Sequence, residues 1–246
     1  MVPLDVAYAE TKARMLEAVG GPDSSAWNTP VPAAPEWTVF DVVAHVTGIA
    51  VDAVNDNLPT DLNVLEQFRD ADVVAARDEF ADGQVLRRRG RNPAEVVDEW
   101  NAAESTLLER LRDPGGPKAL PFAFDVVMVT DLCIHADDVA LALGRPPARD
   151  SVASKAALAA YGYGVDYRLR ALGLPALALR YDGKERTLGE GEPAATLTAD
   201  RWELLRVLAG RRSRAQIQAL DWTGNPEPYL PLLPAYGERE DALIEQ

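Results

Sequence analysis

The spacing of apolar residues along the chain predicts a series of long helices in its first two thirds. Residues 4–19 carry apolar side chains at three- and four-residue intervals, and Gly20-Gly21 then stops the helix. The same periodicity predicts three more long helices, over 38–54, 93–113 and 124–143, and a less regular helical stretch around 64–80. Four long helices joined by connections of mixed length indicate a helical bundle.

Two of these helices have clear start signals. Thr38 is followed three residues later by Asp41, the spacing of a capping box. Asn92-Pro93 places a capping side chain directly before a proline in the first turn. Residues 22–37, between the first two helices, are too rich in proline and serine to predict regular structure. The two tryptophans of this connection are expected to anchor it to the bundle.

The pattern changes beyond residue 150. One more helix is expected over 152–172, and apolar residues then alternate over 177–181 ahead of an Asp182-Gly183 turn, which is typical of a β-hairpin. A further strand is expected at 195–199, and Asp200 caps the short helix that follows. This half of the chain therefore predicts a small α+β domain.

The fold class that follows is mainly α with a smaller α+β part. A four-helix bundle is expected over residues 1–147 and the small α+β domain over residues 148–246. A chain of 246 residues is long enough for both parts to bury a core.

Composition narrows the possible partners. The formal net charge of −14 argues against binding to nucleic acid or to anionic membranes, both of which require clustered positive charge. The basic run 87–91 is flanked by acidic segments and is interpreted as a solvated helix end. Cys133 is the only cysteine, which excludes an internal disulfide, and no secretion signal or membrane-spanning run is apparent. We therefore expect a cytoplasmic protein.

The candidate chemistry lies in two apolar helices. His45 and His135 are the only histidines of the chain, and Asp131 precedes His135 by four residues, so both side chains share one helix face. Two histidines and a carboxylate are a usual three-ligand set for Zn²⁺, with a fourth position open to water or substrate. Of Asp137 and Asp138, which follow His135, Asp138 is the better candidate to accept a hydrogen bond from the second ring nitrogen of His135. Cys133 is expected to face away from the site as a buried apolar side chain.

A structural interpretation competes with the metal site. A histidine within an apolar helix is more often a core residue, and an Asp–His pair four residues apart is also an ordinary helix-stabilising contact. Against this, both histidines lie in strongly apolar helices, where an unpaired imidazole is costly. Our prediction is that His45, Asp131 and His135 meet at one site.

Two segments resemble a known family. Residues 27–46, WNTPVPAAPEWTVFDVVAHV, and residues 131–144, DLCIHADDVALALG, are similar to the two signatures of the mycothiol-dependent maleylpyruvate isomerase-like proteins. This family belongs to the DinB-like superfamily and is of actinobacterial type. Residues 204–217, LLRVLAGRRSRAQI, resemble its small C-terminal domain. The resemblance implies a DinB-like four-helix bundle followed by a small α+β domain.

The resemblance also implies a function. It places a Zn²⁺ ion, or another divalent metal such as Ni²⁺, on His45, Asp131 and His135, and it implies mycothiol as the thiol cofactor. The characterised isomerase has glutamate where this chain has Asp131, whose side chain is one methylene shorter. In that enzyme, maleylpyruvate is isomerised from cis to trans with mycothiol, and the metal activates the thiol.

The first hypothesis is therefore a metal-dependent, thiol-using enzyme of isomerase or transferase type. Its partners would be a low-molecular-weight thiol and a small electrophilic substrate, and the protein would be a monomer or a homodimer. Arg211 and Arg212 are candidates to bind an anionic cofactor, although arginines at a helix end usually cap carbonyls or pair with acids. The second hypothesis is a non-catalytic small-molecule-binding or regulatory protein that keeps the bundle. A lipid-carrier-like pocket in the α+β half is a weaker third hypothesis.

Overall fold

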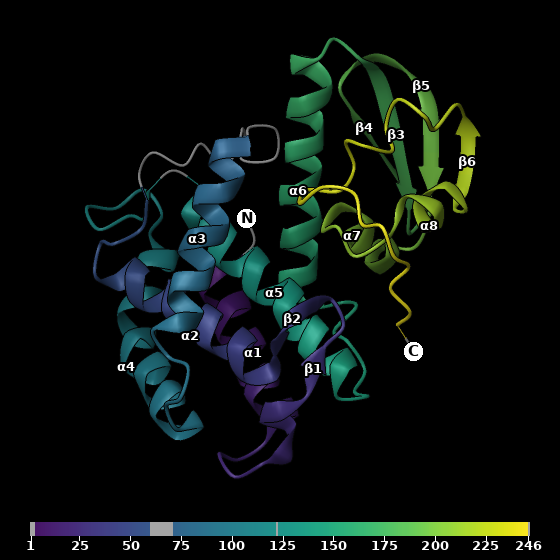
Figure 1. Ribbon diagram of the computed structural model, residues 1–246. Coiled ribbons are helices and arrows are strands. Elements are labelled where there is room, and N and C mark those ends of the chain that lie inside the picture. The colour runs from purple at the N-terminus through teal and green to yellow at the C-terminus, as the bar shows by residue number, and fades with distance from the viewer. Residues whose placement is uncertain (1–2, 60–70, 122, 246) are drawn as a thin grey trace. The chain divides into compact units, whose positions relative to one another are not determined.

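The computed structural model describes residues 3–59, 71–121 and 123–245 (Figure 1). The chain forms two compact units, which divide between Ala153 and Ser154. This division lies six residues after the predicted domain boundary at 147/148, just inside a helix that begins at Val152. Each unit is described by itself below.

The first unit is a bundle of helices, as predicted. Its described helices are α1 (Leu4–Val19), α2 (Val39–Val54), α3 (Ala71–Leu86), α4 (Pro93–Arg112) and α5 (Phe124–Ala142). Helix α1 packs against α4 and α5, and α2 packs against α3, α4 and α5. Within the described residues, no helix combines the length and the apolar character that a membrane span requires.

The capping box at the start of α2 is confirmed. Asp41 accepts hydrogen bonds from the backbone N–H of Thr38 at 3.0 Å and from its hydroxyl at 2.9 Å, and its own N–H donates to Thr38 Oγ1. Asp41 also accepts a bond of 2.9 Å from Nε of Arg89, which follows α3. The first turn of α2 is thereby joined to a second part of the bundle.

The interpretation of the basic run as a solvated helix end holds for Arg87 and Arg89, whose side chains are 55% and 50% exposed, but it is wrong for Arg88. Arg88 is only 4% exposed and forms a two-pronged ion pair with Glu99 of α4. Arg87 pairs with Asp52 of α2 at 3.2 Å, and Arg89 pairs with Asp41. Acidic partners on α2 and α4 therefore face this run, although only Arg88 is buried.

The connection over residues 22–37 also differs from the prediction. It contains a 3₁₀ helix, η1 (Ser25–Asn28), and two short antiparallel strands, β1 (Pro30–Val31) and β2 (Ala34–Thr38). Proline is tolerated at strand starts and at strand edges, so the proline content did not exclude a pairing of this length. The tryptophans do anchor it: Trp27 is 4% exposed, and Trp37 is half-buried.

The helix expected around 64–80 is seen only in part, because residues 60–70 lie outside the described residues. Helix α3 continues beyond Phe80 to Leu86. Its last turns approach α2 closely at Gly48, and Gln84 is completely buried there, donating to Asp52 at 3.0 Å. This buried contact explains why the polar end of α3 remains helical.

The second unit is α+β, as predicted, and it follows the start of α6 (Val152–Ala171). Its four-stranded sheet has the order β4-β3-β5-β6, with β3 and β5 parallel and the other pairs antiparallel. The elements that follow α6 are β3 (Pro175–Tyr181), β4 (Lys184–Leu188), β5 (Glu190–Thr198), α7 (Arg201–Leu208), α8 (Arg214–Gln218) and β6 (Asp221–Gly224). The sequence did not predict β6.

Candidate metal centre

Helices α2 and α5 bring the three predicted residues together. Nε2 of His45 lies 3.2 Å from Oδ2 of Asp131, and Nε2 of His135 lies 3.6 Å from Oδ1 of the same carboxylate. The two imidazole centroids are 5.2 Å apart, with the ring planes at 76°. One carboxylate therefore faces the same nitrogen of both rings, so the shorter side chain of aspartate reaches both histidines.

The cluster lies among apolar side chains. His45 is 6% exposed and His135 is 9% exposed, while the side chain of Asp131 is 18% exposed. Helix α2 buries almost every residue around His45, and α5 buries the residues on both sides of His135. Asp131 is therefore the most exposed member of the cluster.

The donor atoms fit one divalent ion in kind and approximately in spacing. One donor atom from each of the three residues lies within 4.8 Å of the other two. A tetrahedral Zn²⁺ with bonds of about 2.0–2.2 Å holds its ligand atoms roughly 3.3–3.6 Å apart. The donor atoms of the three residues would therefore have to approach one another by about 1 Å to bind the ion. Nδ1 of His45 is buried without a hydrogen bond among the described residues.

The second ring nitrogen of His135 faces a carboxylate. Nδ1 of His135 lies 3.7 Å from Oδ2 of Asp138, whose side chain is fully buried. Metal-binding histidines commonly direct their remaining nitrogen to such an acceptor, which fixes the tautomer and the ring direction. Asp138 occupies the predicted place, and Cys133 is completely buried, as expected.

Sequence reasoning did not predict that Trp37 would belong to the cluster. Its indole centroid lies 5.1 Å from the ring of His45 and 6.1 Å from that of His135. The available signal was its position directly before the capping residue Thr38, which places it about two helical turns ahead of His45 of α2.

A family model matches the part of the chain that holds the cluster. Residues 8–140 match the family model described as the Mycothiol maleylpyruvate isomerase N-terminal domain, and this range holds all three cluster residues. The match covers more than half of the chain. The chain belongs to this family. Among curated proteins, none matches the sequence significantly.

Two solved structures share the fold. The crystal structure of a histidine-to-alanine variant of the mycothiol-dependent maleylpyruvate isomerase has a TM-score of 0.56 and 12% sequence identity, covering 85% of this chain and 86% of that chain. A second crystal structure of the mycothiol-dependent maleylpyruvate isomerase has a TM-score of 0.55 and 13% identity, covering 85% and 87%. At this identity the likeness shows the fold alone, and it confirms the predicted DinB-like architecture.

A second group of buried polar residues lies on α1 and α4 of the family domain. Nζ of Lys12 binds Asn101 at 2.8 Å and Glu104 at 3.1 Å, and Tyr8 accepts a hydrogen bond of 2.8 Å from Trp100. Burial lowers the pKa of Lys12, although Glu104 opposes this effect. Burial also raises the pKa of Tyr8 above its usual range, with further contributions from Glu104 and from the cluster residue Asp131.

The two predicted cofactor-binding arginines lie in the second unit. Arg211 donates to the carbonyl of Ala209 at 2.7 Å, at the end of α7. Arg212 pairs with Glu203 and with Glu245, each at 2.6 Å. These contacts match the alternative interpretation, in which such arginines cap carbonyls and pair with acids. A cofactor-binding role for them stays a prediction.

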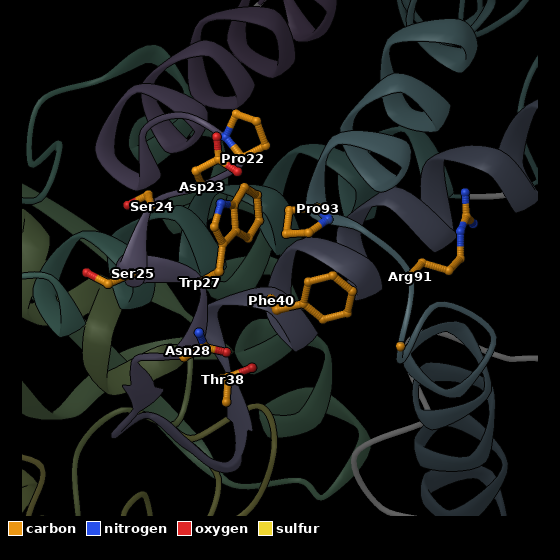
Figure 2. A pocket seen from close by; sticks show the side chains of 11 residues that line it. Pro22, Asp23, Ser24, Ser25, Trp27, Asn28, Thr38, Phe40, Arg91 and Pro93 are labelled. Carbon is orange, nitrogen blue, oxygen red and sulfur yellow. The ribbon is translucent and has the colours of Figure 1, made fainter.

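A cavity of about 490 Å³ lies where α2 and α4 begin (Figure 2). Trp27 and Phe40, whose rings meet edge to face at 6.4 Å, form part of its wall together with two prolines. Arg91 also lines it, but its guanidinium binds Glu99 at 2.7 Å. None of the three cluster residues lines this cavity, so it is distinct from the candidate metal centre.

Proposed function

We propose that this protein is a metal-dependent enzyme of isomerase or transferase type that uses a low-molecular-weight thiol on a small electrophilic substrate. The observation that carries the proposal is the convergence of His45, Asp131 and His135 from two helices onto donor positions within 4.8 Å. Membership of the family supports a thiol of the mycothiol kind. Two imidazoles and one carboxylate are a usual donor set for Zn²⁺, and Ni²⁺ is another divalent candidate.

The residues of the chain have distinct parts in this proposal. His45, Asp131 and His135 would hold the ion, and Asp138 would fix the ring of His135 through Nδ1. A divalent ion at such a site lowers the pKa of a bound thiol and polarises a bound carbonyl. Three protein ligands leave one position of a tetrahedral ion for the thiol. Asp131 is the most exposed of the three side chains, so the thiol would approach from its side.

The metal part of the proposal is tested by thermal unfolding. Zn²⁺ that binds only the native state raises the melting temperature by mass action, and a concentration of 100 Kd adds about 2.7 kcal/mol to the free energy of unfolding. His135→Ala should abolish this rise. Gln218→Ala in the second unit is a control that should retain it, because this exposed side chain contacts Glu227 and not the cluster.

Metal content gives an independent measurement. Protein purified without chelator should carry roughly one equivalent of Zn²⁺ or Ni²⁺, as one three-ligand site requires. A protein that takes up neither ion on titration would contradict the proposal. Stabilisation by apolar small molecules but not by metal would favour the non-catalytic binding protein instead.

The thiol part requires a separate measurement on the metal-loaded protein. Mycothiol should perturb the absorption spectrum of the Co²⁺-substituted protein, because a thiolate that enters the open position would shift the visible ligand-field bands and add a sulfur-to-metal charge-transfer band in the near ultraviolet. Glutathione serves as the comparison thiol. An unchanged spectrum with both thiols would contradict a thiol cofactor while leaving the metal site standing.

A further inference from the structure

The indole of Trp37 contacts both histidines of the candidate metal centre. Its centroid is 5.1 Å from the ring of His45 and 6.1 Å from that of His135, and the two imidazoles are themselves 5.2 Å apart. The indole plane is tilted by 44° to one imidazole and by 34° to the other. One ring system therefore spans both imidazoles and does not stack on either one alone.

This contact bears on the direction of the ligand nitrogens. Nε2 of each imidazole lies beside the carboxylate of Asp131, at 3.2 Å for His45 and 3.6 Å for His135. Rotation of either ring about its terminal torsion would carry Nε2 away from that carboxylate, and such torsions are broad unless packing restricts them. A rigid indole in contact with both rings restricts both rotations together.

Trp37 itself is held by the backbone on either side of it. The next residue, Thr38, caps α2 and is bound through its N–H and its hydroxyl to Asp41. The N–H of Val39 donates to the carbonyl of Thr29 at 2.9 Å, and β2 pairs with β1. Since His45 lies on the helix that begins here, a capped helix start joins the backbones of Trp37 and His45.

We propose that Trp37 is a positioning residue that holds the imidazoles of His45 and His135 in the orientation that binds one cation. As far as it concerns the cation, this inference rests on the proposed function. Pre-orienting both ligands removes the ordering cost from the binding step, which raises affinity without adding a ligand. The indole is half-buried, and its ring packs against both imidazoles.

A purely packing role for Trp37 makes different predictions. Trp27 provides the matched comparison, because it lies in the same connection and is more deeply buried, at 4% exposed. Its ring meets Phe40, and its Nε1 donates to the carbonyl of Gly21 at 3.0 Å. Replacing either tryptophan should lower the stability of the protein. Only replacement of Trp37 should alter the orientation of the imidazoles of His45 and His135.

The first experiment compares Trp37→Leu, Trp37→Phe and Trp27→Phe by competition with a chromophoric chelator for Zn²⁺ and Co²⁺. Trp37→Leu should weaken metal affinity roughly tenfold, the low end of the effect of removing a residue that orients a ligand. Trp37→Phe keeps an aromatic face and should recover most of the affinity. Trp27→Phe should bind as the wild type does. Wild-type affinity in folded Trp37→Leu would overturn the inference.

The second experiment needs no metal, so it separates this inference from the proposed function. Long-range ¹H–¹⁵N spectra of the metal-free protein should show one sharp set of signals for each imidazole in the wild type and in Trp27→Phe. In Trp37→Leu the imidazole signals should broaden, or merge into averaged signals, because the rings would exchange between orientations. If the wild type binds no cation but its imidazoles respond in this way, the proposed function fails and the orienting role stands. Unchanged imidazole signals in Trp37→Leu overturn the inference.

Discussion

At the scale of single residues, Asp41 joins three segments of the first unit. It caps α2 through Thr38 and accepts a hydrogen bond from Arg89. Burial raises the pKa of the Asp41 carboxyl, but the bonds from Thr38 and Arg89 outweigh burial and hold the pKa below its usual value. An acid whose pKa is lowered by folding adds stability above its unfolded pKa of about 3.9, and this stability is lost as the pH falls through the folded value.

Asp41→Asn should therefore lower the free energy of unfolding at pH 7 by about 1–2 kcal/mol, since it weakens a helix cap and an ion pair. The difference from the wild type should shrink as the pH falls from about 4 towards the lower folded pKa, because the carboxyl is then protonated first in the unfolded state and finally in the folded protein as well. Denaturant unfolding at a series of pH values measures both effects. Asp98→Asn, on the exposed face of α4, is the control and should show neither. A difference that stays constant down to pH 2 would contradict the role of this charge.

The three candidate ligands could be predicted from the sequence because the chain has only two histidines and both occur in apolar helices. It did not contain the contribution of Trp37, because a half-buried tryptophan in a proline-rich connection has no periodicity to place it. The ion pair between Arg88 and Glu99 was missed for a related reason: charges in sequence do not reveal which acid of a distant helix will face them. Local patterns predicted the candidate ligands, whereas the residues that surround them depend on tertiary contacts.

At the scale of elements, the close approach of α2 and α3 depends on Gly48. A Cβ atom added there would lie 2.5 Å from Cβ and 2.8 Å from Cγ of Gln84, which is completely buried. Gly48→Ala should therefore destabilise the protein by about 1–3 kcal/mol through overpacking, even though alanine favours a helix over glycine by about 1 kcal/mol. Chemical denaturation measures the change.

Gly83→Ala, on the partner helix α3, is the matched control for Gly48→Ala. Its added Cβ would meet only the end of the flexible Arg87 side chain, at 3.2 Å, so the guanidinium can move aside. The variant should be as stable as the wild type or up to about 1 kcal/mol more stable. Equal destabilisation by both substitutions would show that helix α3, and not the close approach at Gly48, sets the cost.

Element boundaries show where sequence patterns are sufficient. Helices α1, α2, α4 and α5 were predicted within a few residues because their apolar periodicity and their caps agree. Strand β6 was missed because it is a four-residue edge strand whose pairing with β5 is set by the sheet and not by its own composition. The parallel pairing of β3 with β5 was not predicted either, because the alternation of apolar residues within a strand does not show which other strand it pairs with.

At the scale of the whole molecule, each unit has its own buried polar network, and the network of the second unit is centred on Glu245. In the second unit, the fully buried Arg206 and its neighbour Arg212 both pair with Glu245, and both guanidiniums lie 5.6 Å from the ring of Trp202. Gln216 holds the same segment through the N–H and the carbonyl of Leu243. A buried ion pair that loses one partner costs about 3–5 kcal/mol.

Hydrogen exchange can distinguish stabilisation of the first unit by Zn²⁺ from destabilisation of the second unit by loss of the Glu245 ion pairs. Zn²⁺ should slow exchange in α2 and α5 of the first unit, since the proposed ligands lie on these helices. Glu245→Ala should speed exchange in α7 and α8, because the carboxylate that it removes binds Arg206 of α7 and Arg212 between the two helices. Exposed Glu192→Ala is the control for the loss of an acid. Unchanged exchange of α7 and α8 in Glu245→Ala would show that the segment ending at Glu245 adds nothing to the stability of the second unit.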